Sequence, residues 1–234
     1  MDNKKIAALD WGRIESDLNK EGYALLPKFV TDQEIDGLKQ LANNQDKQGQ
    51  QQSLDALGLG VGNFLRLPNQ LPQPLHRCRE ALFSRLVPIA NRWSEIMGKD
   101  TRYPPSMTDY ARVNQELGQV VEMSFISSMQ PGEYHALHQN LVDANTFPLQ
   151  LVILLSDPTK DFFGGEFIMT EQRPRMQSRP MVLPLRKGDA AIITVAHRPF
   201  RGSKGYYRVN IKHAVSRLRS GERMAIELIF HQAP

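Results

Sequence analysis

The chain has 234 residues, of which 41% are hydrophobic, and this suits one domain or a domain with a substantial extension. No apolar run approaches the length of about 18 residues that a membrane helix needs, which excludes a membrane-spanning protein of that kind. The first residues carry charges but no apolar stretch typical of a secretory signal. The single cysteine, Cys78, excludes an intrachain disulfide, and we expect a cytoplasmic protein.

The net charge of +4 is modest, but basic residues are concentrated between positions 173 and 223. In this range only Asp189 and Glu222 are acidic. The segment is interpreted either as a solvated face with structural ion pairs or as a surface for phosphates, including those of a nucleic acid. The basic residues are Arg173, Arg175, Arg179, Arg186, Lys187, Arg198, Arg201, Lys204, Arg208, Lys212, Arg217, Arg219 and Arg223.

The first forty residues predict a helix, a short strand and a second helix. Residues 11–19 have apolar side chains at helical spacing, and residues 22–27 form a short strand that ends at a proline. Thr31 and Glu34 have the spacing of a capping box at the start of the second helix.

The next segment is less regular. Residues 43–53 are rich in Gln and Asn, and we expect a flexible loop or a disordered insertion. Residues 54–74 are punctuated by Gly and Pro and predict irregular structure. Residues 75–97 predict a long amphipathic helix, and residues 109–117 a shorter one.

From residue 120 the pattern changes to strands. Residues 121–126 alternate, and residues 147–156 form a nearly continuous apolar run, typical of a strand buried on both faces. Further short strands follow at 165–169, 189–195, 207–215 and 224–231. Several short strands separated by turns indicate a sandwich or barrel. We therefore expect an α+β protein in which 120–234 form the barrel core and 1–119 are a helix-rich extension of the same domain.

Two histidines have the separation expected of a metal site. His138 precedes the apolar run, and His213 lies in a late strand, so the two can face each other across the mouth of a jelly roll. A non-haem Fe(II) site needs two imidazoles and a carboxylate and leaves three positions open. Ten residues after His213, and beyond a glycine turn, Arg223 can bind a dicarboxylate bidentately, as a 2-oxoglutarate site requires.

Residues from about 120 to 232 resemble the superfamily of 2-oxoglutarate- and Fe(II)-dependent oxygenases. They are most similar to a bacterial AlkB-like family described as acting in oxidative demethylation of damaged DNA. The resemblance is carried by segments 134–140, 147–156, 164–178, 184–190 and 207–217, which are spread over a region of roughly half of the chain. It implies a double-stranded β-helix core, Fe(II) and 2-oxoglutarate as cofactors, and oxygenase activity with dioxygen as co-substrate.

The resemblance also implies roles for individual residues, and at two positions the chain departs from the family. His138 and His213 match the imidazole ligands, and Arg223 matches the anchor of the cosubstrate carboxylate. Asn140 stands where the family has its acidic metal ligand, and Met129 where a tyrosine usually helps to hold 2-oxoglutarate. An asparagine offers only a neutral oxygen, which weakens the binding of a hard cation.

Three explanations of Asn140 are open: a variant with reduced turnover, a substitute ligand such as Asp143, or a pocket that has lost catalysis. Gln150 follows the ligand segment on the buried strand, where it can bind the cosubstrate or satisfy backbone groups. His135 is expected on the opposite face from His138, and His231 at the surface or at a cap.

Two functions follow from these residues. The first is a dioxygenase that hydroxylates a substrate C–H, with alkylated nucleic acid, a protein side chain or a small metabolite as substrate. The second is a catalytically impaired or non-catalytic binding protein that keeps the oxygenase fold, which Asn140 and Met129 favour.

Overall fold

The computed structural model describes residues 3–45 and 50–234. For residues 42–45 and 50 it describes the backbone only. The helices are α1 Asn3–Ala7, α2 Trp11–Glu21, α3 Asp32–Gln45, α4 Gln73–Ile96 and α5 Met107–Glu116. The first strands are β1 Tyr23–Leu26, β2 Gln50–Ser53, β3 Gly60–Val61, β4 Asn63–Arg66, β5 Val121–Glu122, β6 Phe125–Met129, β7 Tyr134–His138 and β8 Leu149–Leu154. The later strands are β9 Phe162–Gly164, β10 Phe167–Gln172, β11 Arg179–Leu183, β12 Ala190–Thr194, β13 His197–Gly202, β14 Gly205–Val215, β15 Leu218–Gly221, β16 Arg223–Ile229 and β17 Gln232–Ala233.

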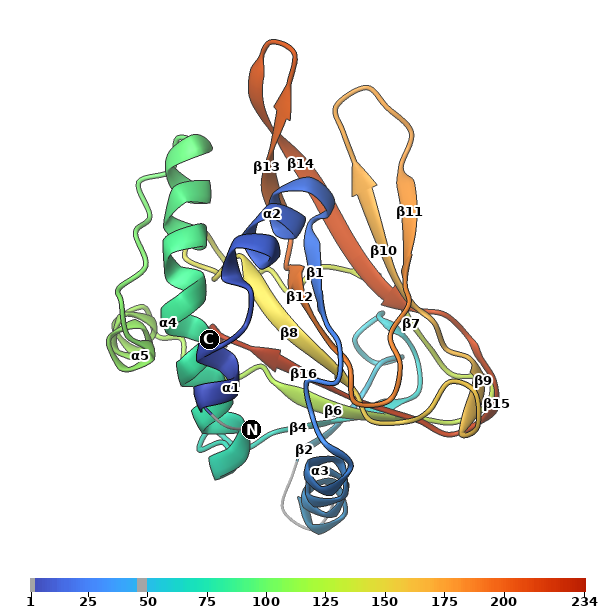
Figure 1. Cartoon of the computed structure of the whole chain (residues 1–234). Coiled ribbons are helices and arrows are strands. Elements are labelled where there is room, and N and C mark those ends of the chain that lie inside the picture. The colour runs from blue at the N-terminus through green and yellow to red at the C-terminus, as the bar shows by residue number, and fades with distance from the viewer. Residues whose placement is uncertain (1–2, 46–49) are drawn as a thin grey trace.

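Two antiparallel sheets form the core (Figure 1). The larger sheet has the strand order β1-β12-β8-β16-β6-β4-β2, and the smaller has the order β11-β10-β14-β7-β3, with β13 also paired to β14. Strands distant in the chain are neighbours within each sheet, as in a jelly roll. The prediction of an α+β protein with a jelly-roll core is confirmed.

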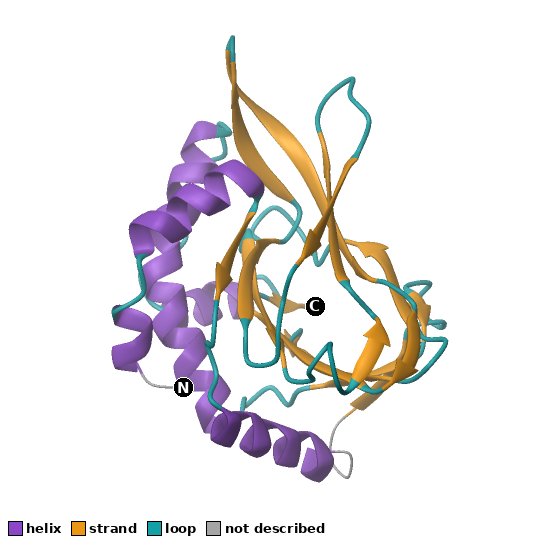
Figure 2. Cartoon of the chain, turned by 45° about the vertical axis from the view of Figure 1, so that its right-hand side comes forward, coloured by secondary structure: helices purple, strands orange, loops and turns teal. Residues whose placement is uncertain are grey.

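The central strands β8 and β12 of the larger sheet are buried on both faces. One face packs on a core that includes Phe83 and Trp93 of α4, while the other faces the smaller sheet. Figure 2 shows the helices gathered on one side of the strands. The near-continuous apolar sequence of β8 follows from this double burial, because each face of the strand meets a hydrophobic layer. None of the described helices is long and apolar enough to cross a membrane.

The N-terminal segment contributes to the larger sheet. The predicted capping box is present, since Glu34 N donates to Thr31 Oγ1 at 3.2 Å and Thr31 N donates to Glu34 Oε2 at 2.9 Å. β1 pairs with β12 along its whole length. The division at residue 119 stays a prediction, although strands from both sides of it share one sheet.

Two predictions for the segment between α3 and α4 are wrong in part. Residues 46–49 lie outside the described residues, but β2 occupies part of the expected flexible stretch. β4 lies in the segment expected to be irregular, between β2 and β6 in the sheet. A polar sequence is tolerated in β2 because an edge strand has a free side, so its pattern does not resemble that of a core strand.

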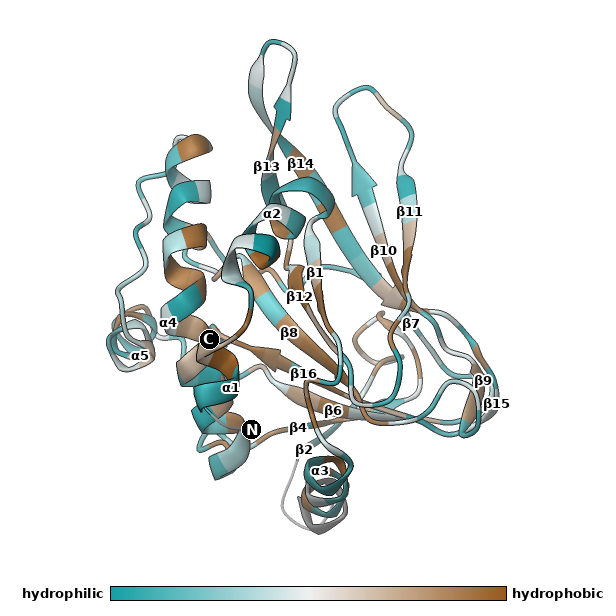
Figure 3. Ribbon diagram, viewed as in Figure 1, coloured by the Kyte–Doolittle hydropathy of each residue, from teal (hydrophilic) through white to brown (hydrophobic). Residues whose placement is uncertain are grey.

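Two hairpins project beyond the sheets, one formed by β10 and β11 and the other by β13 and β14 (Figure 1). Figure 3 shows hydrophilic residues at their outer ends and hydrophobic residues where the same strands enter the core. The exposed part of the basic segment is therefore concentrated on these two projections.

Candidate active site

His138 and His213 are direct cross-strand partners. His138 ends β7, His213 lies in β14, and the pairing of the two strands places their Cα atoms opposite each other. The ring centroids are 4.2 Å apart. Both side chains lie between the two sheets, so the smaller sheet brings together the two imidazoles that the sequence separates by seventy-five positions.

A β-bulge adds a third imidazole to this pair. His135 and His138 oppose Val215 and His213, so three residue steps on β7 match two on β14. The extra residue turns His135 to the same side as His138, and the two rings stack at 3.8 Å. The prediction that His135 points to the opposite face is therefore wrong, because strict alternation fails at a bulge.

The protonation of His138 suits a metal ligand. Its Nδ1 lies 2.9 Å from the carbonyl oxygen of Ala136, which can only accept a hydrogen bond, so Nδ1 carries the proton. Nε2 keeps its lone pair and has no hydrogen-bond partner among the described residues. Burial lowers the pKa of His138 to about 3 and that of His135 to about 4, so both rings are neutral near pH 7.

Arg223 begins β16 with its guanidinium buried, and its residue is 1% exposed. Burial lowers the pKa of Arg223 to about 10, which leaves it charged near pH 7. Nε and Nη1 have no hydrogen-bond partner within the described part of the chain. A buried cation with two free N–H groups fits the carboxylate of a bound anion, and 2-oxoglutarate has such a group.

Met129 lies directly across from Arg223 on β6 and is buried. Its thioether has no proton to donate, so this position presents an apolar surface across from Arg223. The predicted cosubstrate residues Arg223 and Met129 are thus neighbours on two adjacent strands.

A chain of amide hydrogen bonds runs from Asn140 to a carboxylate that sequence reasoning missed. Asn140 Nδ2 donates to Gln150 Oε1 at 2.8 Å, and Gln150 Nε2 donates to Glu227 Oε2 at 2.8 Å. Asn140 Nδ2 also lies 3.5 Å from His213 Nε2, and Glu227 Oε2 lies 3.6 Å from the same nitrogen. Burial raises the pKa of Glu227, but His213 and the other imidazoles outweigh it and lower the pKa to about 2.

Glu227 could have been found from the sequence. It is a charged residue in the apolar stretch Ala225-Ile-Glu-Leu-Ile229, and it follows Arg223 by four residues on a strand. Because side chains alternate along a strand, residues four apart point to the same face. Glu227 is therefore expected on the same face of β16 as Arg223.

Asp143, the predicted substitute ligand, is engaged in its own loop. One carboxylate oxygen accepts a hydrogen bond from Gln119 Nε2 at 2.7 Å, and the other from Asn145 N at 2.8 Å. His231 is fully buried, and the prediction of a surface or capping position for it is wrong, since β16 carries it inward past the end of the strand.

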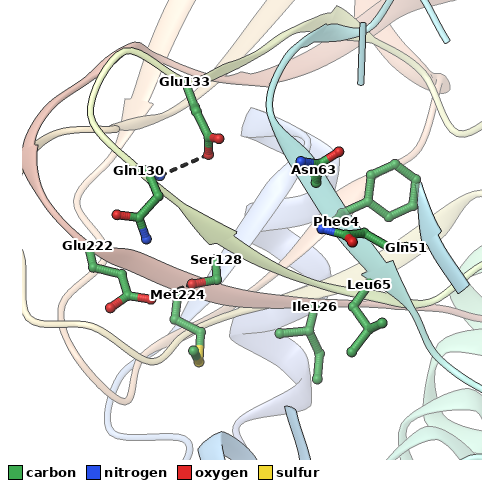
Figure 4. Close-up of a pocket in the computed structure, with 10 residues that line it drawn as sticks. All are labelled: Gln51, Asn63, Phe64, Leu65, Ile126, Ser128, Gln130, Glu133, Glu222 and Met224. Carbon is green, nitrogen blue, oxygen red and sulfur yellow. Dashed lines mark hydrogen bonds between the residues drawn. The ribbon is translucent and has the colours of Figure 1, made fainter. Parts of the chain in front are cut away.

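A separate pocket lies on the far face of the larger sheet (Figure 4). Ser128 and Met224 line it from the sides of β6 and β16 that face away from Met129 and Arg223. Glu133 and Glu222 make it acidic. None of the predicted site residues lines this pocket, and its charge does not suit phosphate.

The donor chemistry fits Fe(II) and 2-oxoglutarate. Two imidazoles and a carboxylate are the ligand types of non-haem iron, and the free guanidinium suits the cosubstrate. Among the described residues, no three His, Cys, Asp or Glu side chains are already gathered around one point. His138, His213 and Glu227 are neighbours, but their donor atoms do not yet surround a common point. Binding of an ion would require small movements of these side chains.

Comparisons with known proteins agree with this geometry. Residues 62–233 match the family described as an oxygenase catalysing oxidative methylation of damaged DNA. The uncharacterized protein MT2286 of Mycobacterium tuberculosis (strain CDC 1551 / Oshkosh) is 39% identical over 166 residues, which are 71% of each chain.

Two solved structures share the fold. A prolyl-4-hydroxylase of Pseudomonas putida superposes with a TM-score of 0.54 at 11% identity and covers 96% of this chain and 99% of its own. SnoN, a non-heme α-ketoglutarate-dependent epimerase from nogalamycin biosynthesis, has a TM-score of 0.56 at 11% identity, with 95% and 83% covered.

The jelly roll and its buried site define the class of 2-oxoglutarate-dependent oxygenases. Within that class, the chain belongs to the family of oxygenases described as acting on damaged DNA. The predicted resemblance is confirmed.

Proposed function

We propose that this protein is an Fe(II)- and 2-oxoglutarate-dependent dioxygenase that hydroxylates a substrate C–H, with alkylated nucleic acid as the first substrate class to test. The observation that carries the proposal is the unpaired, buried guanidinium of Arg223, in the same barrel interior as the cross-strand pair His138–His213. A structural arginine in a barrel core would be paired, because an isolated buried charge is strongly unfavourable.

The residues of the chain divide the work. Fe(II) and 2-oxoglutarate, when bound, supply the dioxygen chemistry that hydroxylates the substrate. His138 and His213 would hold the metal, and Arg223 would bind the far carboxylate of 2-oxoglutarate in a fixed orientation. Met129 and Phe167, which stacks on His213 at 5.9 Å, keep water from the site.

The basic segment supports nucleic acid as the substrate class, although part of it is structural. Arg173, Arg179, Lys187 and Arg198 each pair with a carboxylate. Exposed cations without an ion pair in the described chain remain on the two hairpins, where they could contact phosphates. These residues are Arg175, Arg201, Lys204, Arg208 and Lys212.

The test is succinate production from 2-oxoglutarate with added Fe(II), in the unchanged chain and in Arg223→Met and Asn140→Asp. We expect succinate in the unchanged chain and a loss of 2-oxoglutarate affinity of at least about tenfold in Arg223→Met, because a bidentate charged contact is removed. A single-stranded oligonucleotide with an N-methylated base should increase succinate and release formaldehyde. Stimulation by a peptide or a small metabolite alone would move the substrate to those classes.

A second candidate is a non-catalytic binding protein, and Asn140 favours it. Its amide nitrogen, which lies 3.5 Å from His213 Nε2, has no lone pair to give a metal. Under this function, calorimetry would detect 2-oxoglutarate binding, and neither the unchanged chain nor Asn140→Asp would form succinate.

A further inference from the structure

We propose that Glu227 is the carboxylate ligand of the metal site and replaces the acidic group that Asn140 does not supply. The inference rests on the proposed function, since it concerns the metal that His138 and His213 would hold. It moves the third ligand from the segment after β7 to β16, the strand that also carries Arg223.

The first observation is the direction of the Glu227 side chain. Arg223, Ala225 and Glu227 alternate along β16, and Ala225 belongs to the core between the two sheets. Glu227 therefore points to the same interior as Arg223, and Oε2 lies 3.6 Å from His213 Nε2. The strand is central in the larger sheet, between β8 and β6, which holds this position rigidly.

The second observation is the direction of the hydrogen bonds from Asn140. An ionised carboxylate only accepts, so Gln150 must turn its NH₂ group toward Glu227. The carbonyl oxygen of Gln150 then faces Asn140, which must turn its own NH₂ group to it. Glu227 thus sets the orientation of both amide groups. In this orientation the amide nitrogen of Asn140, and not its carbonyl oxygen, lies next to His213 Nε2.

The third observation is distance. A separation of 3.6 Å between His213 Nε2 and Glu227 Oε2 is too long for a hydrogen bond. Two donors, each about 2.1 Å from one ion, lie about 3.0 Å apart at a right angle and about 3.4 Å apart at the tetrahedral angle. The observed separation of 3.6 Å is slightly longer than either value, so a small movement of the two side chains would let both atoms bind one ion.

The fourth observation is charge. Arg223 makes no ion pair within the described residues, so it does not neutralise Glu227 through a direct contact. The remaining neighbours of the carboxylate are the amide of Gln150 and the imidazoles. A buried carboxylate is retained at such a cost when it is paired or coordinates a metal. His213 at 3.6 Å is a charged partner only when its ring is protonated, and a divalent cation bound by both groups would supply the positive charge instead.

The experiment measures Mn²⁺ binding from the loss of its free-ion EPR signal, without 2-oxoglutarate and without turnover. The chains are the unchanged protein, Glu227→Gln, Asn140→Ala, and the double variant Asn140→Asp with Glu227→Gln. Glu133→Gln is the matched control, because it removes the same charge from the pocket outside the barrel. Circular dichroism and thermal melting verify that each chain is folded.

We expect Glu227→Gln to weaken Mn²⁺ binding at least about tenfold and Asn140→Ala to change it less than about threefold. Asn140→Asp in the Glu227→Gln background should restore the affinity, because it returns one carboxylate to the site. The control should bind as the unchanged chain does. Undiminished binding in Glu227→Gln, with a loss in Asn140→Ala, would overturn the inference and leave the proposed function standing.

Absence of Mn²⁺ binding in the unchanged chain would instead count against the proposed function itself. If Glu227→Gln does not fold, anomalous scattering from Mn²⁺ soaked into crystals of the unchanged chain decides the question. An ion within about 2.3 Å of a Glu227 carboxylate oxygen supports the inference, and an ion bound without that contact refutes it.

Discussion

At the residue scale, Gly165 makes room for Arg223. A Cβ atom at Gly165 would lie 2.9 Å from Arg223 Cδ and 3.0 Å from Leu218 Cδ1, and the backbone there has a φ of +66°. Gly164 is the last residue of β9, and Gly165 follows it directly. Gly165 therefore lies directly against the aliphatic part of the Arg223 side chain.

Gly165→Ala should therefore weaken 2-oxoglutarate binding by about tenfold or more, because Arg223 must leave its position. Gly58→Ala is the matched control, since Gly58 has a φ of +67° but no atom within 4 Å of the new Cβ. Both variants lose about 1 kcal/mol through the backbone, and Gly165→Ala loses more. Calorimetric titration with 2-oxoglutarate and urea unfolding measure the two effects, and equal losses in both variants would contradict the account.

Cys78 offers a second test at this scale. It lies on α4 with no exposed surface, and burial raises the pKa of its thiol to about 12. The thiolate is the reactive form, so the folded protein should not react with a disulfide reagent near pH 8, and one thiol should appear after unfolding in guanidinium. Rapid stoichiometric labelling of the folded chain would show that α4 opens readily.

At the element scale, α5 and the segment before it hold the loop that follows Asn140. The hydroxyl of Tyr103 donates to Thr146 O at 2.8 Å, and that of Tyr110 donates to Asn145 O at 2.7 Å. Both rings pack against Phe147 at the end of the same loop. The helical segment thus positions the residues that lead from the site into β8.

Burial raises the pKa of Tyr103 and that of Tyr110 well above the usual value near 10. The folded state then keeps protons that the unfolded state loses, so stability is complete below about pH 10 and falls as the pH rises above it. The phenolate absorbance should show these two tyrosines ionising only as the chain unfolds. Tyr110→Phe should reduce the alkaline slope of stability, and ionisation of both phenols in an intact fold would contradict the prediction.

At the scale of the whole molecule, Arg198 ties the N-terminal segment to both hairpins. It lies in β13 with no exposed surface, pairs with the buried Glu171 of β10, and donates to Asn19 O at 2.7 Å and Lys20 O at 2.9 Å at the end of α2. One side chain of the basic segment is therefore an internal clamp and not part of a phosphate-binding surface.

Arg198→Met should cost about 3 to 5 kcal/mol of stability, because it leaves the Glu171 carboxylate buried with only Arg173 beside it. Arg179→Met is the control, since Arg179 pairs with Glu21 at the surface, where such a pair contributes at most about 1 kcal/mol. Guanidinium unfolding measures both. Similar small losses in the two variants would show that the clamp does not connect the elements energetically.

The sequence by itself determined the elements with strong local signals and the frame of the site. Helical spacing and the Thr31 capping box predicted the helices. The spacing of His138, His213 and Arg223 predicted one site, and the fold makes the two histidines cross-strand partners. These features can be predicted because the period of the hydrophobic residues is a local property of the sequence. The spacing of the ligand residues follows the strand order that the fold class has in common.

Only the tertiary structure decided the features that depend on pairing between distant strands. A bulge opposite His213 turned His135 inward, and the edge of a sheet made a strand of the polar Gln50–Ser53 segment. The convergence of β7, β8 and β16 joined Asn140 and Gln150 to Glu227. Which residues become neighbours across a sheet depends on how distant strands pair and in which register. Glu227 stands out in the sequence as a charge in an apolar strand, but its approach to His213 was visible only in the folded chain.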